Sequence, residues 1–325
     1  MTQKDNIRTL VEFILQNIEA VNSTGLYNGK AGLSLSLFQA SRHLQDEELE
    51  DIGFRLLQES LITKNNDISF ENGLAGIGYT LLYLIENKYL EANFKEIFEE
   101  QYEILLKSLK YIEKEPFKLV YSMPVIYFLS KVSRFEDERV RVIIKKNFEG
   151  SELFLAVQFQ DFDNIYYINK KIGVLHIYKA YLKLINYTGY TSFSHSLLRD
   201  YADLYKKGKI LSSLEIGFYL KEITTLCNIK GYEYVVSENI NNGIKNLYLD
   251  TLSLKEKIDL AQIANKIVDK NISEYNLLPE IENIHSKKVM QTLLLTVEGK
   301  ALPQCYGAGL ARLLIYCINN QTELL

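Results

Sequence analysis

Apolar residues recur at steps of three and four in several long segments, which is the period of an amphipathic helix. The clearest such segments are residues 4–21, 46–61 and 94–112. Shorter segments follow at 31–43 and at 77–85, and the second of these is apolar almost throughout, as expected of a helix buried on all sides. Polar and apolar residues alternate briefly within 31–43, but the segment contains no breaker, which favours a helix. The pattern therefore predicts striped helices that alternate with fully buried ones.

A Gly-rich stretch opens each of these two shorter segments. Both stretches read Asn-Gly-x-Ala-Gly followed by an aliphatic residue, beginning at Asn28 and at Asn72. A Gly-rich turn repeated about every 40–45 residues is typical of a helical array. Neither stretch has the Lys-Ser/Thr pair of a phosphate-binding loop. Glycines that allow a loop and a helix to approach each other closely are the favoured interpretation.

Five later segments keep this spacing, but four of them lack the Gly-rich stretch. Units of this kind bury a core only against their neighbours, so we expect one domain over residues 1–325. The expected fold is all-α, an (α/α) toroid of two concentric rings of helices with about seven repeats. The five later units are expected at 117–129, 172–182, 209–220, 252–263 and 305–316.

The composition argues against nucleic-acid-binding, secreted and membrane-spanning proteins. The net charge is -4 at pH 7, which provides no basic surface for nucleic acid. The chain contains 3 cysteines, widely spaced, as is typical of free thiols in a reducing cytoplasm. Its polar start argues against a signal peptide, and no apolar run reaches the about 18 residues that span a bilayer. We therefore expect a cytoplasmic protein with no transmembrane segment.

The Gly-rich stretches resemble those of the lanthionine synthetase C-like (LanC-like) family. Residues 25–32 and 72–78 look like its repeated G-L-x-x-G-x-A-G signature, and residues 307–311 look like its last repeat. Gly173-Val-Leu-His176 is similar to its G-x-A-H segment, with Leu175 in place of alanine. The resemblance implies a double-ring α-toroid and work on ribosomally made peptides. In that chemistry a zinc-bound cysteine thiolate of the substrate adds to a dehydrated Ser or Thr and closes a thioether ring.

The chain departs from the family where the family binds zinc. The resemblance implies a first cysteine ligand in the fifth repeat, and Ile210 stands at that position. The other two ligands, a C-H-G in the sixth repeat, align with 252–254 or 254–256, where neither Cys nor His occurs. Lys118 takes the place of the family's acidic residue. We therefore expect no metal ligands and no cofactor, although the family uses zinc.

The candidate site residues follow from the same comparison. His176 matches a family active-site histidine and is the candidate catalytic residue; a core histidine bonded to a hydroxyl is the equal alternative. A new metal site from Cys227, Cys305 and His285 is disfavoured because no short-spaced ligand pair exists. Burial is the favoured role for Cys305, ahead of a reactive thiol. The expected binding or cavity residues are Tyr27, Asn28, Asn72, Tyr121, Cys305 and Tyr306.

Three functions remain for such a chain. The first is a pseudoenzyme of lanthipeptide-type (RiPP) peptide modification, a non-catalytic, zinc-free scaffold that binds a precursor peptide or a partner enzyme. The alternative is an active thioether cyclase, or another peptide-modifying enzyme, with atypical ligands. A different toroid enzyme acting on sugars or isoprenoids is disfavoured, because the chain lacks Trp and a D-D-x-x-D segment. The aromatic run at 159–167 is a further candidate peptide surface, with helix packing the favoured interpretation.

Overall fold

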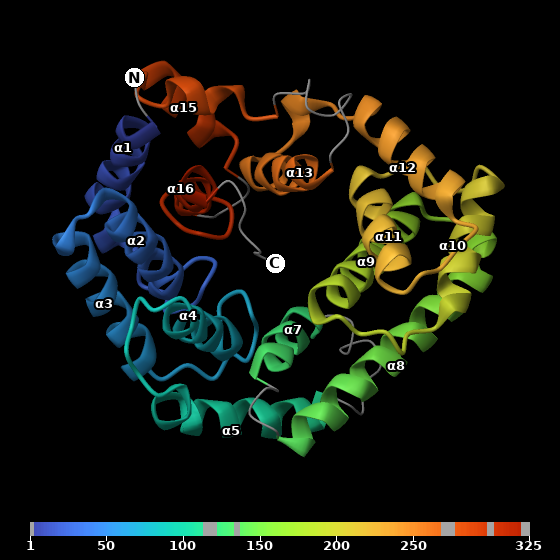
Figure 1. Cartoon of the computed structure of the whole chain (residues 1–325), viewed down its shortest axis with the longest axis horizontal. Coiled ribbons are helices and arrows are strands. Elements are labelled where there is room, and N and C mark those ends of the chain that lie inside the picture. Colours follow the sequence, from blue (N-terminus) through green and yellow to red (C-terminus); the bar gives the residue numbers. More distant parts are fainter. Residues whose placement is uncertain (1–2, 113–121, 133–136, 268–276, 298–301, 320–325) are drawn as a thin grey trace. The chain divides into compact units, whose positions relative to one another are not determined.

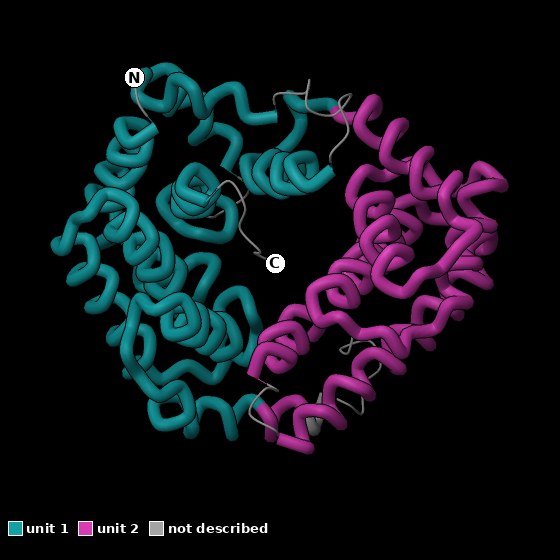
Figure 2. The backbone as a smooth tube through the Cα atoms, in the orientation of Figure 1, with its two compact units in different colours: residues 1–105, 248–325 teal, residues 106–247 magenta. Residues whose placement is uncertain are grey.

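The computed structural model describes residues 3–112, 122–132, 137–267, 277–297 and 302–319. Within these residues the chain is helical, with no strand and one isolated bridge between Ser23 and Gly29. The chain forms two compact units, residues 1–105 with 248–325 and residues 106–247 (Figure 2). The ends of the sequence thus contribute to the same unit.

The first unit has two layers of helices (Figure 1). In the buried layer α13 contacts α16, α16 contacts α2, and α2 contacts α4. The second layer covers one side of the first, and one of its helices, α5, contains the boundary between the units. The buried layer is α2 (Lys30–Leu44), α4 (Leu74–Glu86), α13 (Leu254–Lys266) and α16 (Leu310–Asn319), and the covering layer is α1 (Gln3–Gln16), α3 (Glu47–Ile62), α5 (Phe94–Ile112) and α15 (Lys287–Leu295).

The second unit repeats this arrangement with fewer helices. In its buried layer α9 packs between α7 and α11. Its covering helices contact this layer from one side, α8 against α7 and α9 and α12 against α11. The buried layer is α7 (Met123–Val132), α9 (Ile168–Thr188) and α11 (Leu214–Leu226), and the covering layer is α8 (Glu138–Gln160), α10 (His195–Lys206) and α12 (Glu233–Lys245).

Burial explains the two kinds of sequence pattern. Residues 31–41 of α2 and 74–82 of α4 are buried without interruption, because neighbours surround both helices. The covering helix α1 instead buries one stripe and leaves the rest in solvent, as its period requires. Helix starts are fixed locally: Asp46 accepts from the Glu48 backbone N–H to cap α3, and Ser253 forms a capping box for α13. The sequence pattern therefore has a direct cause in packing.

The expected all-α fold is confirmed, and so is the alternation of layers. Each of the seven expected units falls on a helix of a buried layer, from α2 at the first to α16 at the seventh. Residues 117–121 of the third unit, and with them Lys118 and Tyr121, lie outside the described residues. The expectation of one domain over residues 1–325 stays a prediction, since each compact unit is described by itself. The segment 4–21 is shorter than expected as an α-helix, because α1 ends at Gln16 and a 3-10 turn follows.

A buried amide joins three helices of the second unit. Asn239 on α12 is fully buried; its carbonyl oxygen accepts from the Tyr201 hydroxyl (2.9 Å) and from the Ser213 backbone N–H (3.1 Å). Its amide nitrogen donates to the Val235 carbonyl at 2.8 Å. An apolar side chain would leave the Tyr201 hydroxyl and the Ser213 backbone N–H without this acceptor, and each such loss costs about 1–3 kcal/mol. Asn239 is thus a structural residue of α12.

We expect Asn239→Leu to lower the free energy of unfolding by about 2 kcal/mol, measured by urea denaturation. Asn242 on the same helix is the control, since its amide bonds only the Glu238 side chain one turn away. Asn242→Ala should change stability by less than about 0.5 kcal/mol. Equal losses in the two variants would contradict the role given to Asn239.

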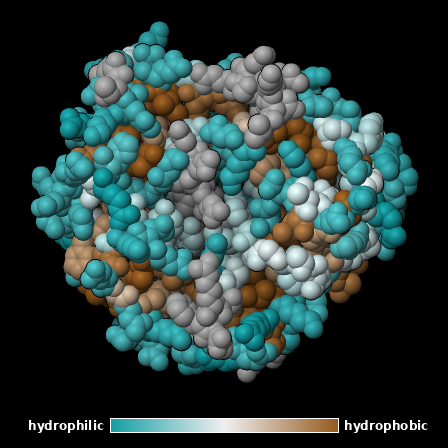
Figure 3. Space-filling view, viewed as in Figure 1, coloured by the Kyte–Doolittle hydropathy of each residue, from teal (hydrophilic) through white to brown (hydrophobic). Residues whose placement is uncertain are grey.

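The surface combines charged residues with scattered apolar ones. On the face that Figure 3 shows, hydrophilic side chains surround smaller hydrophobic patches. In the aromatic run at 159–167, Phe159 and Phe162 are buried in the unit, whereas Tyr166 and Tyr167 are 92% and 71% exposed. Packing thus accounts for the first half of the run only. Among the described residues no helix is long and apolar enough to cross a membrane.

Candidate functional site

Three Gly-rich loops meet in the first unit, each leading into a helix of its buried layer. Gly29, Gly73 and Gly309 directly precede the first residues of α2, α4 and α16. In all three loops the first helical residue donates its backbone N–H to the carbonyl seven positions earlier, at 2.7–2.9 Å. The first, second and seventh units therefore share one loop conformation, although only the first two share the full motif.

Equivalent positions of the three loops bond to one another. The Gly307 N–H donates to the Tyr27 carbonyl at 2.7 Å, and the Tyr27 N–H donates to the Glu71 carbonyl at 2.6 Å. One position further along, the Asn28 side-chain amide donates to the Asn72 side-chain oxygen at 3.4 Å. The loops thus form a ladder in the order seventh, first, second. Tyr27 is its central member.

Glycine is required where the loops and helices touch. A Cβ on Gly25 would overlap the backbone of Asn72 in the next loop. A Cβ on Gly32 would overlap the Leu26 carbonyl oxygen and lie 2.6 Å from the Tyr306 Cβ. A Cβ on Gly76 would meet the Phe70 carbonyl in the same way. These glycines let backbone pack on backbone, as the sequence predicted.

Arg312 breaks this rule in the seventh unit. Counted from the helix start, it occupies the position of Gly32 and Gly76, so that Gly-x-Ala-Gly becomes Gly309-Leu-Ala-Arg312. Its side chain is fully buried, and the guanidinium carbon lies 5.4 Å from the centre of the Tyr306 ring. Tyr306 also packs edge-on against Tyr27, with ring centres 5.9 Å apart. A large cation thus lies beneath the loop ladder.

A second cation and one carboxylate on α13 complete the cluster. Asp259 accepts a hydrogen bond from Nη2 of Arg312 through one oxygen and from Nζ of Lys255 through the other, the latter at 2.7 Å. The Asp259 and Lys255 side chains are 15% and 30% exposed, so this end of the cluster reaches solvent. The charges sum to +1. Nε and Nη1 of Arg312 have no hydrogen-bond partner among the described residues.

The electrostatics of the cluster follow from burial and from these charges. Burial raises the pKa of the Tyr27 hydroxyl, and the Arg312 and Lys255 charges oppose that rise only in part. Burial lowers the pKa of Lys255, but the Asp259 carboxylate more than offsets this, so the pKa is raised overall. At neutral pH Tyr27 is therefore a neutral hydroxyl beside two fixed cations. Such an arrangement favours a bound anion.

The structure brings together five of the six expected binding residues. Tyr27 and Asn28 lie on the first loop, Asn72 on the second, and Cys305 and Tyr306 on the seventh. Tyr121 lies outside the described residues. The candidate catalytic residue, His176, lies in the second unit on α9, with an exposed side chain. Its role stays a prediction.

Sequence reasoning missed the charged members of the cluster. Lys255 and Asp259 are an i, i+4 pair on α13, a spacing visible in the sequence. Arg312 is the one charged residue of α16, whose other residues are almost all apolar. A lone arginine in a buried helix was thus the available signal, because burying a guanidinium requires a partner.

The thiols of the first unit are not prepared for metal binding or nucleophilic attack. Burial raises the pKa of Cys305 and of Cys317 to about 12 each. Both are therefore neutral thiols at pH 7, and the thiolate is the reactive form. Burial as the role of Cys305 agrees with this.

We expect the folded chain to react with Ellman's reagent at one cysteine of three, Cys227, the only one of them not buried. In denaturant all three should react. Rapid labelling of Cys305 in the folded protein, identified by peptide mass mapping, would contradict its burial.

The raised pKa of Cys305 also affects stability. The free energy of unfolding that the neutral thiol contributes is fully present below about pH 9 and is lost as the pH rises toward 12.

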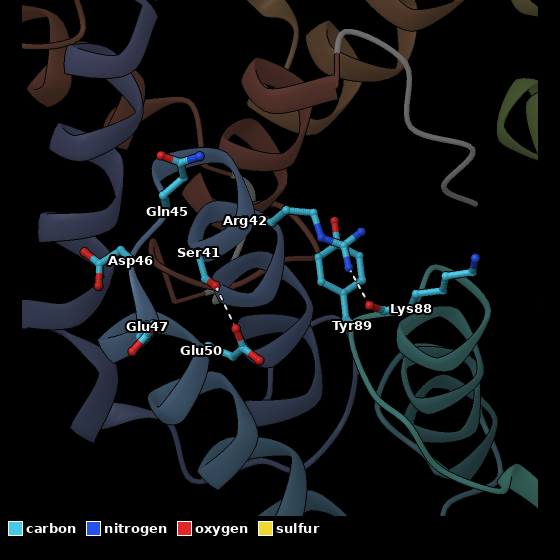
Figure 4. Close-up of a pocket in the computed structure, with 8 residues that line it drawn as sticks. All are labelled: Ser41, Arg42, Gln45, Asp46, Glu47, Glu50, Lys88 and Tyr89. Carbon is cyan, nitrogen blue, oxygen red and sulfur yellow. Dashed lines mark hydrogen bonds between the residues drawn. The ribbon is translucent and has the colours of Figure 1, made fainter.

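A separate polar pocket of about 340 Å³ lies where α2 ends and α3 begins (Figure 4). The Arg42 guanidinium stacks on the Tyr89 ring at 3.5 Å and donates to the Asn87 and Lys88 carbonyls at 2.9 and 2.6 Å. These carbonyls follow the end of α4, so Arg42 has a structural role as a helix C-terminal cap. Asp46 on the same rim caps α3. The polar side chains of this pocket thus serve to cap helix ends. The loop ladder, with the charged cluster of Arg312, Lys255 and Asp259, is the better candidate site.

Comparison with known proteins finds a similarity over the first part of the chain. A family model described as lanthionine synthetase C-like protein matches residues 5–146, which include the first two Gly-rich loops. No curated protein and no solved structure gives a significant match. The seventh unit lies outside the matched residues, yet its loop shares their hydrogen bonds. Over residues 5–146, which are less than half of the chain, the sequence is similar to the lanthionine synthetase C-like family.

Proposed function

We propose that this chain acts in a peptide-modification system as a non-catalytic, zinc-free LanC-like protein that binds a precursor peptide or a partner enzyme. The family match supports the link to peptide modification. The observation that carries the rest is a contrast between two parts of the chain. The loops of the first unit have the Gly-rich conformation in detail, whereas neither Cys nor His stands at the positions that the resemblance aligns with the family's zinc ligands.

The residues present do not fit a zinc ion. Ile210, aligned with the first cysteine ligand, is 6% exposed, and Leu254, within the alignment of the C-H-G, is fully buried. Aliphatic side chains cannot donate an electron pair to a metal. Within the part of the chain that the structure describes, no three His, Cys, Asp or Glu side chains are grouped to hold a metal ion.

A peptide-binding role uses what the loop cluster offers. Tyr27 and Asn72 are partly exposed and lie on adjacent loops, and Tyr27 interacts electrostatically with Lys255 and Asp259 on α13. A tyrosine ring, amide groups and fixed charges are the groups that bind extended peptides by stacking and hydrogen bonding. His176 is the proposed residue of the second unit that contacts the same class of ligand.

The test uses the purified full-length chain and a synthetic peptide with one cysteine and one dehydroalanine. We expect substoichiometric zinc by metal analysis, peptide binding by fluorescence anisotropy, and no increase in the rate at which the cysteine becomes resistant to iodoacetamide. A faster loss of the alkylatable thiol, together with one zinc per chain removed by Cys227→Ser or Cys305→Ser, would instead establish the alternative, an active cyclase with atypical ligands. Lack of binding would contradict the scaffold proposal.

A further inference from the structure

We propose that Arg312 and Lys255 form a carboxylate-binding site beneath the loop ladder, which takes an acidic side chain or the C-terminal carboxylate of a bound peptide. The inference rests on the proposed peptide-binding function for the identity of its ligand. The site itself rests on three observations. A packing glycine is replaced by arginine, two nitrogens of that arginine have no hydrogen-bond partner among the described residues, and the charges of Arg312, Lys255 and Asp259 sum to +1.

The replacement is specific to the seventh unit. In the first two units the equivalent glycine is closed off by the carbonyl oxygen of Leu26 or Phe70. In the seventh unit Tyr306 stands at the position of that residue, and its ring lies over the guanidinium. The space that backbone fills elsewhere is here occupied by a charged side chain. Packing alone does not require arginine, since glycine serves in the other two units.

The donors of Arg312 are only partly used. A guanidinium has five N–H donors, and Asp259 accepts a hydrogen bond from one of its nitrogens, Nη2. Nε and Nη1 are buried and have no partner among the described residues. Leaving buried donors unsatisfied is unfavourable, so this arrangement suits a site completed by a ligand. An acceptor with negative charge gives the strongest hydrogen bonds to such donors.

The charge balance selects an anion. Asp259 is shared by two cations, and one positive charge remains after it is counted. Glu71, the other carboxylate acting on Tyr27, is exposed and is therefore screened by solvent. Lys255 and Asp259 are partly exposed and form the approach from solvent.

The first arm of the test measures the melting temperature of the full-length chain in sodium acetate against sodium chloride at equal ionic strength. We expect acetate to raise the melting temperature of the wild type and of Arg312→Lys, but not of Arg312→Met. Lys257→Met is the matched control. Lys257 lies on α13, as Lys255 does, and is a buried cation that pairs with Glu280 at 2.9 Å. It should retain the acetate response. If Arg312→Met does not fold, Lys255→Met takes its place, since the Lys255 side chain is partly exposed. We expect Lys255→Met to weaken the acetate affinity at least tenfold.

The second arm compares two blocked peptides, Ac-Ala-Glu-Ala-NH2 and its Gln counterpart, by saturation-transfer NMR. We expect the Glu peptide to bind at least tenfold more tightly, and Arg312→Met or Lys255→Met to abolish the difference. No acetate effect, with equal binding of both peptides, would overturn the carboxylate site and leave the proposed peptide binding intact. An acetate effect with no binding of either peptide would restrict the site to small free carboxylates and contradict the peptide role.

Discussion

Replacing Gly32 by alanine is expected to lower the free energy of unfolding by about 3 kcal/mol. The added methyl group would overlap the Leu26 carbonyl oxygen of its own loop and press on Tyr306 of the seventh loop. Both neighbours are held in place, the first by backbone and the second by burial, so the loop ladder must shift. Alanine is the better helix former, but that gain is about 1 kcal/mol and does not offset the overlap.

Gly173→Ala is the matched control for this prediction. Gly173 lies within α9, and a Cβ added there would have no neighbour within 4 Å. We expect this variant to be more stable than the wild type by about 0.5–1 kcal/mol, through helix propensity alone. Thermal or urea unfolding of the two variants compares them directly. A neutral Gly32→Ala would mean that the loop is not packed as described.

These two glycines also show what sequence reasoning could reach. Both were interpreted as parts of a family signature, Gly32 in the first loop and Gly173 before His176. At Gly32 the close approach inferred from the motif is present. At Gly173 the surroundings are open, because the residue lies inside a helix and not at a loop that packs on its neighbour. A motif at the correct spacing therefore indicates the unit but does not guarantee the contact.

The fold was accessible because its determinants are local. Periodicity separates buried from covering helices, and the Gly-rich loops mark where the buried helices begin. The charged cluster was not accessible, because it depends on which units become neighbours. Asp259 and Arg312 lie far apart in the sequence, and a bond between them follows only when α13 and α16 pack side by side. The sequence therefore indicates Tyr27 and Tyr306 as single positions, but it does not indicate that Arg312 lies beside them.

Replacing Asp259 by asparagine is expected to lower the free energy of unfolding by about 3 kcal/mol, within the range for breaking a buried ion pair from one side. The change leaves the guanidinium of Arg312 buried without a counter-charge, and Lys255 loses its partner at the same time. The exposed pair of Arg141 and Glu138 is the control, since Glu138→Gln should cost less than about 0.5 kcal/mol.

The double variant Asp259→Asn, Arg312→Met separates charge from packing. Removing the orphaned cation should recover at least half of the loss, because an apolar side chain of similar size needs no counter-charge. Urea unfolding of the wild type, both single variants and the double variant gives the coupling energy between the two positions. If the losses of the single variants simply add, Asp259 and Arg312 do not act as a pair. If acetate restores stability to Asp259→Asn but not to the double variant, a free carboxylate can take the place of Asp259 beside Arg312, which is the chemistry required of the proposed site.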